Sequence, residues 1–110
     1  MAIFIKTENP KELLEKIKAK IGEHYWSEWK IDKDGDFSNQ YDYMEKAWLK
    51  PKIMPKNLVM GIIGRKDMDM TTNTYAYFHS QFCKFILEKF DNDIISIRIT
   101  PQMVEGIDKF

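Results

Sequence analysis

The sequence predicts an α+β domain, a two-layer sandwich in which two helices cover one face of a mostly antiparallel sheet of four to five strands. Two stretches have the apolar periodicity of amphipathic helices. Several shorter stretches either alternate between apolar and polar residues or are continuously apolar, and both patterns are typical of strands. Asp34-Gly35 indicates a hairpin turn, which favours antiparallel pairing. The expected order is β-α-β-β-β-α-β, with a ferredoxin-like or related split arrangement as one candidate topology.

The two helices are the elements with the clearest signals. Asn9 is a suitable N-cap for a helix that begins at Pro10, and Gly22 is placed to end it. Its apolar stripe consists of Leu13, Leu14, Ile17 and Ile21. The second helix is expected between capping residues at 71–73 and the polar residues 91–93. Its apolar stripe consists of Tyr75, Phe78, His79, Phe82, Phe85, Ile86 and Phe90, with Tyr77 alone on the polar face.

Strands are expected where residues alternate or form a short apolar run, at 2–6, 25–31, 58–64 and 94–100 and from Phe37 onward. Residues 38–46 fit either a strand or a helical turn. Pro51 and Pro55 predict that residues 50–57 form a loop or a sheet edge, although the region near Trp48 could add one further short strand. The tail at 102–110 is expected to be loosely docked.

Length and composition limit the class of protein. A chain of 110 residues fits one domain, residues 1–110, with one core. Its one cysteine, Cys83, excludes an internal disulfide, and there is no apolar run of the kind found in a signal peptide or membrane span, so we expect a cytoplasmic protein. Seventeen basic and 17 acidic residues give a formal net charge of zero, and therefore no global attraction to nucleic acid or an anionic membrane.

The alternating acids Asp32, Asp34 and Asp36 resemble the opening of a calcium-binding loop. The glycine and glutamate that such a loop needs at its sixth and twelfth positions are replaced by Phe37 and Tyr43. We therefore interpret the segment as a hairpin turn and expect no metal there.

His79 and Cys83 are one turn apart on the apolar stripe of the second helix, a spacing that suits a metal site or a thiolate–imidazole pair. A zinc site needs more ligands, but the chain has only one other histidine and no second cysteine. A buried thiol is also unreactive. The sequence therefore predicts a core histidine that is hydrogen-bonded to sheet backbone or to a tyrosine, and no cofactor.

Gly61 and Gly64 precede Arg65-Lys66, but Lys66 is followed by Asp67 and no helix begins there, so a phosphate-binding loop is disfavoured. Glycines that allow close packing of a buried strand explain these positions better.

Overall neutrality conceals two opposite local charges: acids dominate residues 32–45, whereas residues 46–66 contain no acid. With the abundant aromatic residues, this segregation favours a non-catalytic protein–protein interaction domain, of the immunity, inhibitor or adaptor type found in bacteria and phages. The candidate partner-binding residues are Trp26, Tyr41, Tyr43, Trp48 and Tyr77.

Two alternatives remain open at this stage. A nucleic-acid-associated protein would use basic residues of the 46–66 segment near aromatic ones. The candidates for that role are Lys50, Lys52, Lys56, Arg65 and Lys66. A small enzyme would use His79 or the acids at 32–36. The sequence leaves both a monomer and a homodimer open.

Overall fold

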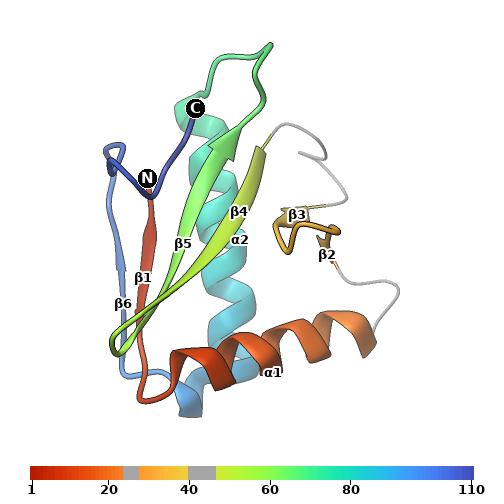
Figure 1. Cartoon of the computed structure of the whole chain (residues 1–110), viewed down its shortest axis with the longest axis vertical. Coiled ribbons are helices and arrows are strands. Elements are labelled where there is room, and N and C mark those ends of the chain that lie inside the picture. The colour runs from red at the N-terminus through yellow and green to blue at the C-terminus, as the bar shows by residue number, and fades with distance from the viewer. Residues whose placement is uncertain (24–27, 40–46) are drawn as a thin grey trace.

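Six strands and two α-helices form two layers in the computed structural model, which describes residues 1–23, 28–39 and 47–110 (Figure 1). The strands are β1 (Ile3–Lys6), β2 (Trp29–Ile31), β3 (Phe37–Asn39), β4 (Ala47–Met54), β5 (Asn57–Gly64) and β6 (Ser96–Ile99). The helices are α1 (Pro10–Glu23) and α2 (Thr72–Phe90), and α2 is followed by a short 3₁₀ helix, η1 (Asp91–Asp93). The strand order in the sheet is β2-β3-β4-β5-β1-β6.

The predicted class, an antiparallel sheet with two helices, is confirmed, but the strand number and order differ from the prediction. The sheet has six strands within the described residues, because β4 is a full strand where only a short one near Trp48 was considered. β1 lies between β5 and β6 and runs antiparallel to both. A split arrangement requires parallel neighbours across a helix, so that candidate topology is wrong.

β4 contains Pro51 and nevertheless pairs with β5 along its whole length. Among the described residues, the other side of β4 pairs only at Leu49, with Phe37 of β3. No described strand bonds to Pro51 on that side, and proline, which lacks an N–H group, is tolerated at such an edge. Residues 50–57 were expected to form either a loop or a sheet edge. Residues 50–54 belong to the strand, as the second expectation has it, and the connection to β5 is only a turn at Pro55-Lys56.

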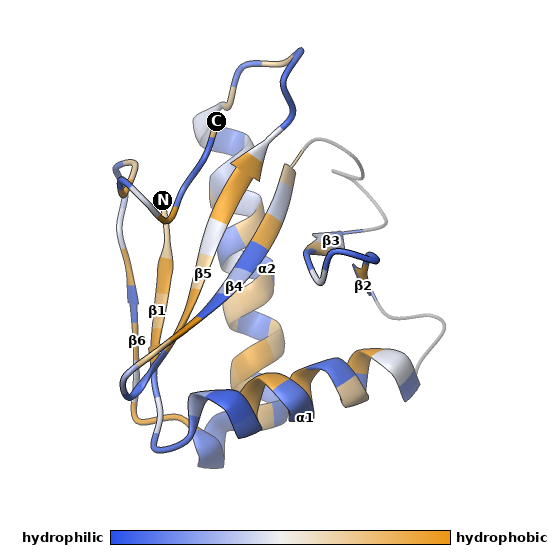
Figure 2. Ribbon diagram, viewed as in Figure 1, coloured by the Kyte–Doolittle hydropathy of each residue, from blue (hydrophilic) through white to orange (hydrophobic). Residues whose placement is uncertain are grey.

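Both helices lie on the same face of the sheet, with α2 behind the central strands in Figure 1 and α1 crossing at their lower end. All four predicted stripe residues of α1 are buried, as are Phe78, Phe82, Ile86 and Phe90 of α2. The apolar colouring of Figure 2 follows these stripes and the central strands. No helix in the part of the chain that the structure describes is long and apolar enough to cross a bilayer.

The predicted capping residues are confirmed at the start of both helices. The Oδ1 atom of Asn9 accepts a 3.1 Å hydrogen bond from the N–H of Glu12, ahead of α1. The Oγ1 atom of Thr71 accepts one of 3.1 Å from the N–H of Thr74, ahead of α2. Side-chain oxygens at these positions satisfy N–H groups that have no partner within the helix.

The carboxyl-terminal tail is bonded to β5. The N–H of Lys109 donates to the Ile62 carbonyl at 2.9 Å, and its carbonyl accepts from the Gly64 N–H at 2.8 Å. The tail thereby occupies the edge of β5 beyond the point where β1 ends. Asp108, the preceding residue, is buried. The expectation of a loosely docked tail at 102–110 is therefore wrong for its last part, because local periodicity cannot reveal a contact formed with a strand some 45 residues away.

Candidate functional site

The sheet has an outer face that no helix covers. Because side chains alternate along a strand and Ala47 and Leu49 belong to the core, Trp48, Lys50 and Lys52 lie on this outer face of β4. Trp48 pairs with Ile63 of β5, Lys50 with Gly61 and Lys52 with Val59. The two lysines therefore stand above a floor of glycine and apolar residues.

The tail forms the second wall of this surface. A Cβ atom at Gly61 would collide with the Ile107 carbonyl oxygen, so the missing side chain is what lets the tail cross closely over β5. Asp108 holds the tail in place: its Oδ1 atom accepts from the Ile62 N–H at 2.8 Å, and its Oδ2 atom lies 3.1 Å from the Met1 amino group. The interpretation of Gly61 as a residue needed for close packing is confirmed.

Two pockets lie between the tail and β4, with volumes of about 610 and 740 Å³. They share Lys50, Ile63 and Lys109 in their walls, so the two pockets adjoin. We call the pair the basic groove and define it by six residues: Lys50, Lys52, Ile63, Arg65, Lys66 and Lys109.

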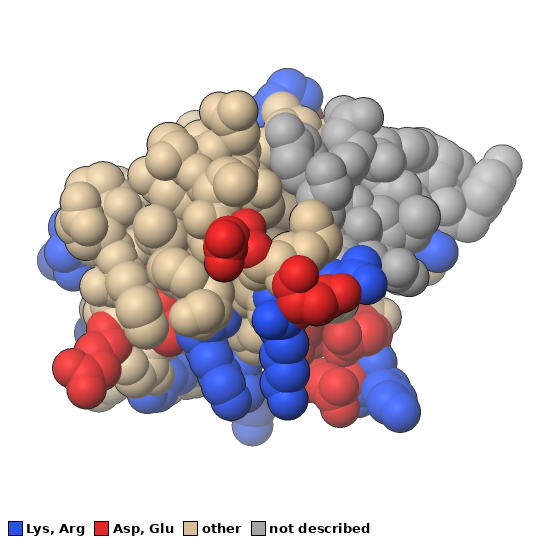
Figure 3. All heavy atoms as spheres, turned by 90° about the horizontal axis from the view of Figure 1, so that it is seen from above, with Lys and Arg blue, Asp and Glu red and all other residues tan. Residues whose placement is uncertain are grey.

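Cations outnumber acids in the walls of the basic groove, which also include Asp69 and the buried Asp108. Within the described ranges, Lys50, Lys52, Lys66 and Lys109 form no ion pair, whereas Arg65 pairs with Asp67 at 2.7 Å. Figure 3, seen from above, shows lysine and arginine gathered along its lower edge, with acidic side chains among them. Local charge of one sign in a depression attracts anions even when the whole chain is neutral.

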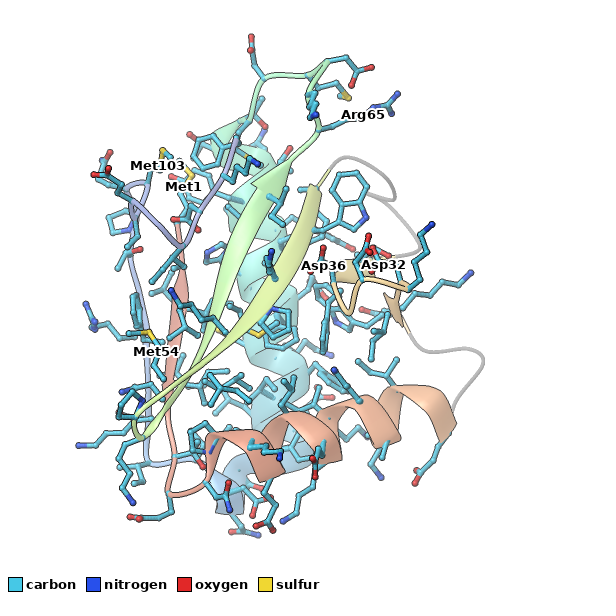
Figure 4. All side chains as sticks on the ribbon, in the orientation of Figure 1. Met1, Asp32, Asp36, Met54, Arg65 and Met103 are labelled. Atoms are coloured by element: carbon cyan, nitrogen blue, oxygen red, sulfur yellow. The ribbon has the colours of Figure 1, made fainter. Side chains whose placement is uncertain are left out.

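The structure brings together four of the five residues predicted for nucleic-acid binding. The exception is Lys56, which lies in the β4–β5 turn and pairs with Glu8 at 3.2 Å. Arg65 lies at the opposite end of this hairpin from Met54, as Figure 4 shows. Lys109 belongs to the groove but was missed, because nothing in the sequence around it indicates that the tail returns to β5.

The aromatic residues predicted to bind a protein partner do not form one surface among those that can be placed. Trp26, Tyr41 and Tyr43 lie outside the described residues. Trp48 is half-buried on the outer sheet face. Tyr77 belongs to α2, on the other face, and is half-buried against the core with its ring 6.3 Å from that of Phe78, so the expectation that it is an exposed aromatic is wrong.

His79 is enclosed, with 3% of its surface exposed. Its Nε2 atom lies 2.7 Å from the Met1 carbonyl oxygen, next to β1, as expected for a core histidine bonded to backbone. Burial lowers the pKa of His79, and the carbonyls of Met1 and Tyr75 oppose that shift. Burial also raises the pKa of the Cys83 thiol, which keeps it protonated and unreactive. This arrangement offers no route for a substrate to His79.

The acids at 32–36 form the turn between β2 and β3. Oδ1 of Asp32 accepts hydrogen bonds from the N–H groups of Asp34, at 2.9 Å, and Asp36, at 3.0 Å, and Gly35 has a φ of 85°. Burial and the nearby Asp32 carboxylate raise the pKa of Asp36, and the ammonium of Lys50 lowers it. Figure 4 shows Asp32 and Asp36 close together in this hairpin. The predicted turn is confirmed, and no cluster of three or more metal-ligating side chains occurs among the residues described.

Comparisons with protein-family models, with curated proteins and with solved structures gave no match to this chain. The functional argument therefore depends on the basic groove alone.

Proposed function

We propose that this chain is a cytoplasmic, non-catalytic domain that binds single-stranded nucleic acid in the basic groove. The observation that carries the proposal is that two adjoining pockets are lined by four lysines from β4, the segment after β5 and the tail: Lys50, Lys52, Lys66 and Lys109. These ammonium groups are exposed, and phosphates would replace water around them.

Apolar and aromatic groups border the cations. Ile63 forms the floor, Trp48 is its cross-strand partner, and Phe110, 46% exposed, lies in the groove wall. A groove that combines cations for the backbone with aromatic rings for bases is typical of sequence-tolerant binding to single strands. A duplex would leave such rings without a stacking partner, so the single strand is the better fit.

The experiment is a titration of a fluorescent single-stranded oligonucleotide at several salt concentrations. We expect the logarithm of the association constant to fall linearly with the logarithm of salt concentration. The Lys50→Gln/Lys109→Gln variant should bind more weakly and reduce this slope by roughly 0.7 for each phosphate contact removed.

A matched control is Lys11→Gln/Lys89→Gln, which removes the same charge from exposed positions on α1 and α2. This variant should keep the wild-type slope. Absence of binding by the wild-type protein at low salt would remove the proposal, as would equal losses in both double variants, because the attraction would then be unspecific.

An acidic protein segment is the competing occupant, and it corresponds to the immunity, inhibitor or adaptor interpretation. A poly-glutamate peptide added to the same titration distinguishes the two: displacement of the oligonucleotide at comparable charge concentration would favour a protein partner. Because a peptide has no bases to stack on Trp48, we expect it to compete poorly.

A further inference from the structure

The outer face of the sheet carries cations beyond the basic groove. Along β1, β4, β5 and β6, the side chains that alternate with the core residues point away from the helices. These outward positions hold no acid, and their cations are Lys6, Lys50, Lys52 and Arg98. Lys6 and Arg98 lie outside the basic groove, on β1 and β6, so the positive face extends to the far edge of the sheet.

One row of cross-strand neighbours joins the groove to this edge. Lys52 of β4 pairs with Val59 of β5, which pairs with Phe4 of β1. Phe4 pairs in turn with Arg98 of β6. Because neighbouring strands are about 4.8 Å apart, the backbones at the two ends of this row are separated by roughly 14 Å. An extended ligand can therefore contact Lys52 and Arg98 at once.

The guanidinium of Arg98 is held in place and is not neutralised. Its central carbon lies 4.3 Å from the centre of the Phe4 ring, and Arg98 forms no ion pair with any described residue. Stacking on a ring fixes the plane of a guanidinium but leaves its N–H groups available, because they point outward within that plane. This fork of donors matches two oxygens of a phosphate.

Lys6 lies diagonally across from Arg98. It pairs with Ser96, two residues before Arg98 on β6, and diagonal neighbours of this kind are within reach of each other's ligands when their side chains are long. Lys6 is exposed and likewise forms no ion pair in the described part of the chain. One phosphate can thus contact the ammonium of Lys6 and the guanidinium of Arg98 together.

We propose that Lys6 and Arg98 form a second phosphate-binding site, and that a single strand bound in the basic groove continues past Lys52 to reach it. This inference rests on the proposed function, since the groove supplies the first contacts. Charge complementarity selects the occupant: the row offers cations at both ends, a half-buried aromatic ring at Phe4 and no acid that would repel phosphates. Only a strand that is long enough reaches both sites, so the contribution of the second site should depend on length.

The test compares fluorescent single strands of about 4 and about 16 nucleotides at several salt concentrations. Lys6→Gln/Arg98→Gln should weaken binding of the long strand and reduce its salt slope by roughly 0.7 for each phosphate contact removed. The short strand, which the groove accommodates alone, should bind this variant as it binds the wild type. Arg98→Lys keeps the charge but loses the fork, so it should keep the slope for the long strand and lower its affinity.

The matched control is Lys11→Gln/Lys89→Gln, which removes the same charge from the two helices and should bind both strands like the wild type. Circular dichroism checks that each variant is folded. If the wild type binds neither strand, the proposed function fails and the second site with it. The second site alone is wrong if the groove variant described above weakens both strands, whereas Lys6→Gln/Arg98→Gln binds the long strand like the wild type. Equal losses for both lengths in Lys6→Gln/Arg98→Gln would also overturn it, because the two cations would then act only at long range.

Discussion

The carboxylate of Asp108 accepts a 2.8 Å hydrogen bond from the backbone N–H of Ile62, and this contact joins the last residues of the chain to the middle of the sheet. The second oxygen of Asp108 accepts a 2.8 Å hydrogen bond from the N–H of Val104 and forms an ion pair with the Met1 amino group. One buried side chain thus connects β5, the tail and Met1, two residues ahead of β1. The wall of the basic groove depends on this connection.

Replacing Asp108 should therefore destabilise the whole fold. Asp108→Ala leaves two backbone N–H groups without their acceptor and removes the carboxylate paired with the Met1 ammonium, and we expect the free energy of unfolding to fall by about 2 to 4 kcal/mol. Urea denaturation measures the change. Glu105→Gln, an exposed position in the same tail, should change the free energy of unfolding by less than about 0.5 kcal/mol. Similar losses in the two variants would contradict the role assigned to Asp108.

A second prediction concerns Gly61, where the tail crosses β5. Gly61→Ala places a methyl group against the Ile107 carbonyl, so the tail must move, and we expect a loss of about 1 to 3 kcal/mol. Hydrogen exchange of the Lys109 amide, which is bonded to Ile62, should become faster. Gly22→Ala is the control: nothing lies near its Cβ position in α1, and alanine should stabilise the helix by about 0.5 to 1 kcal/mol.

A third prediction concerns the pH dependence of stability. Because the pKa of folded His79 is lowered below its ordinary value of 6.5, the unfolded chain takes up a proton first as the pH falls. The stabilisation from neutral His79 is thus complete above about pH 6.5 and is lost as pH falls towards the folded pKa, by at most about 1.4 kcal/mol per pH unit.

The variant His79→Gln separates this effect from other titrations. Glutamine can donate a hydrogen bond to the Met1 carbonyl but does not titrate. When the pH is lowered from 7.5 to 5.5, the unfolding free energy of the variant should therefore fall less than that of the wild type. Urea denaturation at both pH values measures the difference. The other histidine, His24, is present in both proteins and cancels. Parallel pH profiles would show that His79 is not the group responsible.

The sequence predicted the elements whose signals are local. The stripe of α1 and its Asn9 cap, the Asp34-Gly35 turn and the buried run of β5 each depend on neighbours within a few residues, and all are confirmed. β4 was underestimated because Pro51 disfavours a central strand, whereas the edge at that point, to which no described strand bonds, exists only in the assembled sheet.

The candidate site was predictable only in part for the same reason. Four cations of the groove lie in the basic segment 46–66, and the sequence identified them as one group. The pockets that they line are formed only where the tail packs beside β4 and β5, which the sequence does not indicate. Lys109 and Asp108 have no sequence signal, since their role comes from packing against residues far away in the chain. In β6 the alternation correctly predicted a strand, but it could not reveal that the isoleucine side would remain exposed at the edge.

The last prediction separates stacking from charge in the basic groove. Trp48 is half-buried on the outer face beside Ile63, and its ring should stack on a base of a bound single strand. Trp48→Leu should weaken oligonucleotide binding about ten-fold, whereas Trp48→Phe should retain most of the affinity. The slope of affinity against salt should stay unchanged in both, because no phosphate contact is lost.

Tyr77→Leu serves as the matched control, because it removes an aromatic ring from α2, on the other face of the sheet, and should not affect the oligonucleotide. If Trp48→Leu binds as tightly as the wild type, bases do not stack there. The groove would then act on phosphates alone, and any polyanion of similar charge density should compete equally well with the single strand.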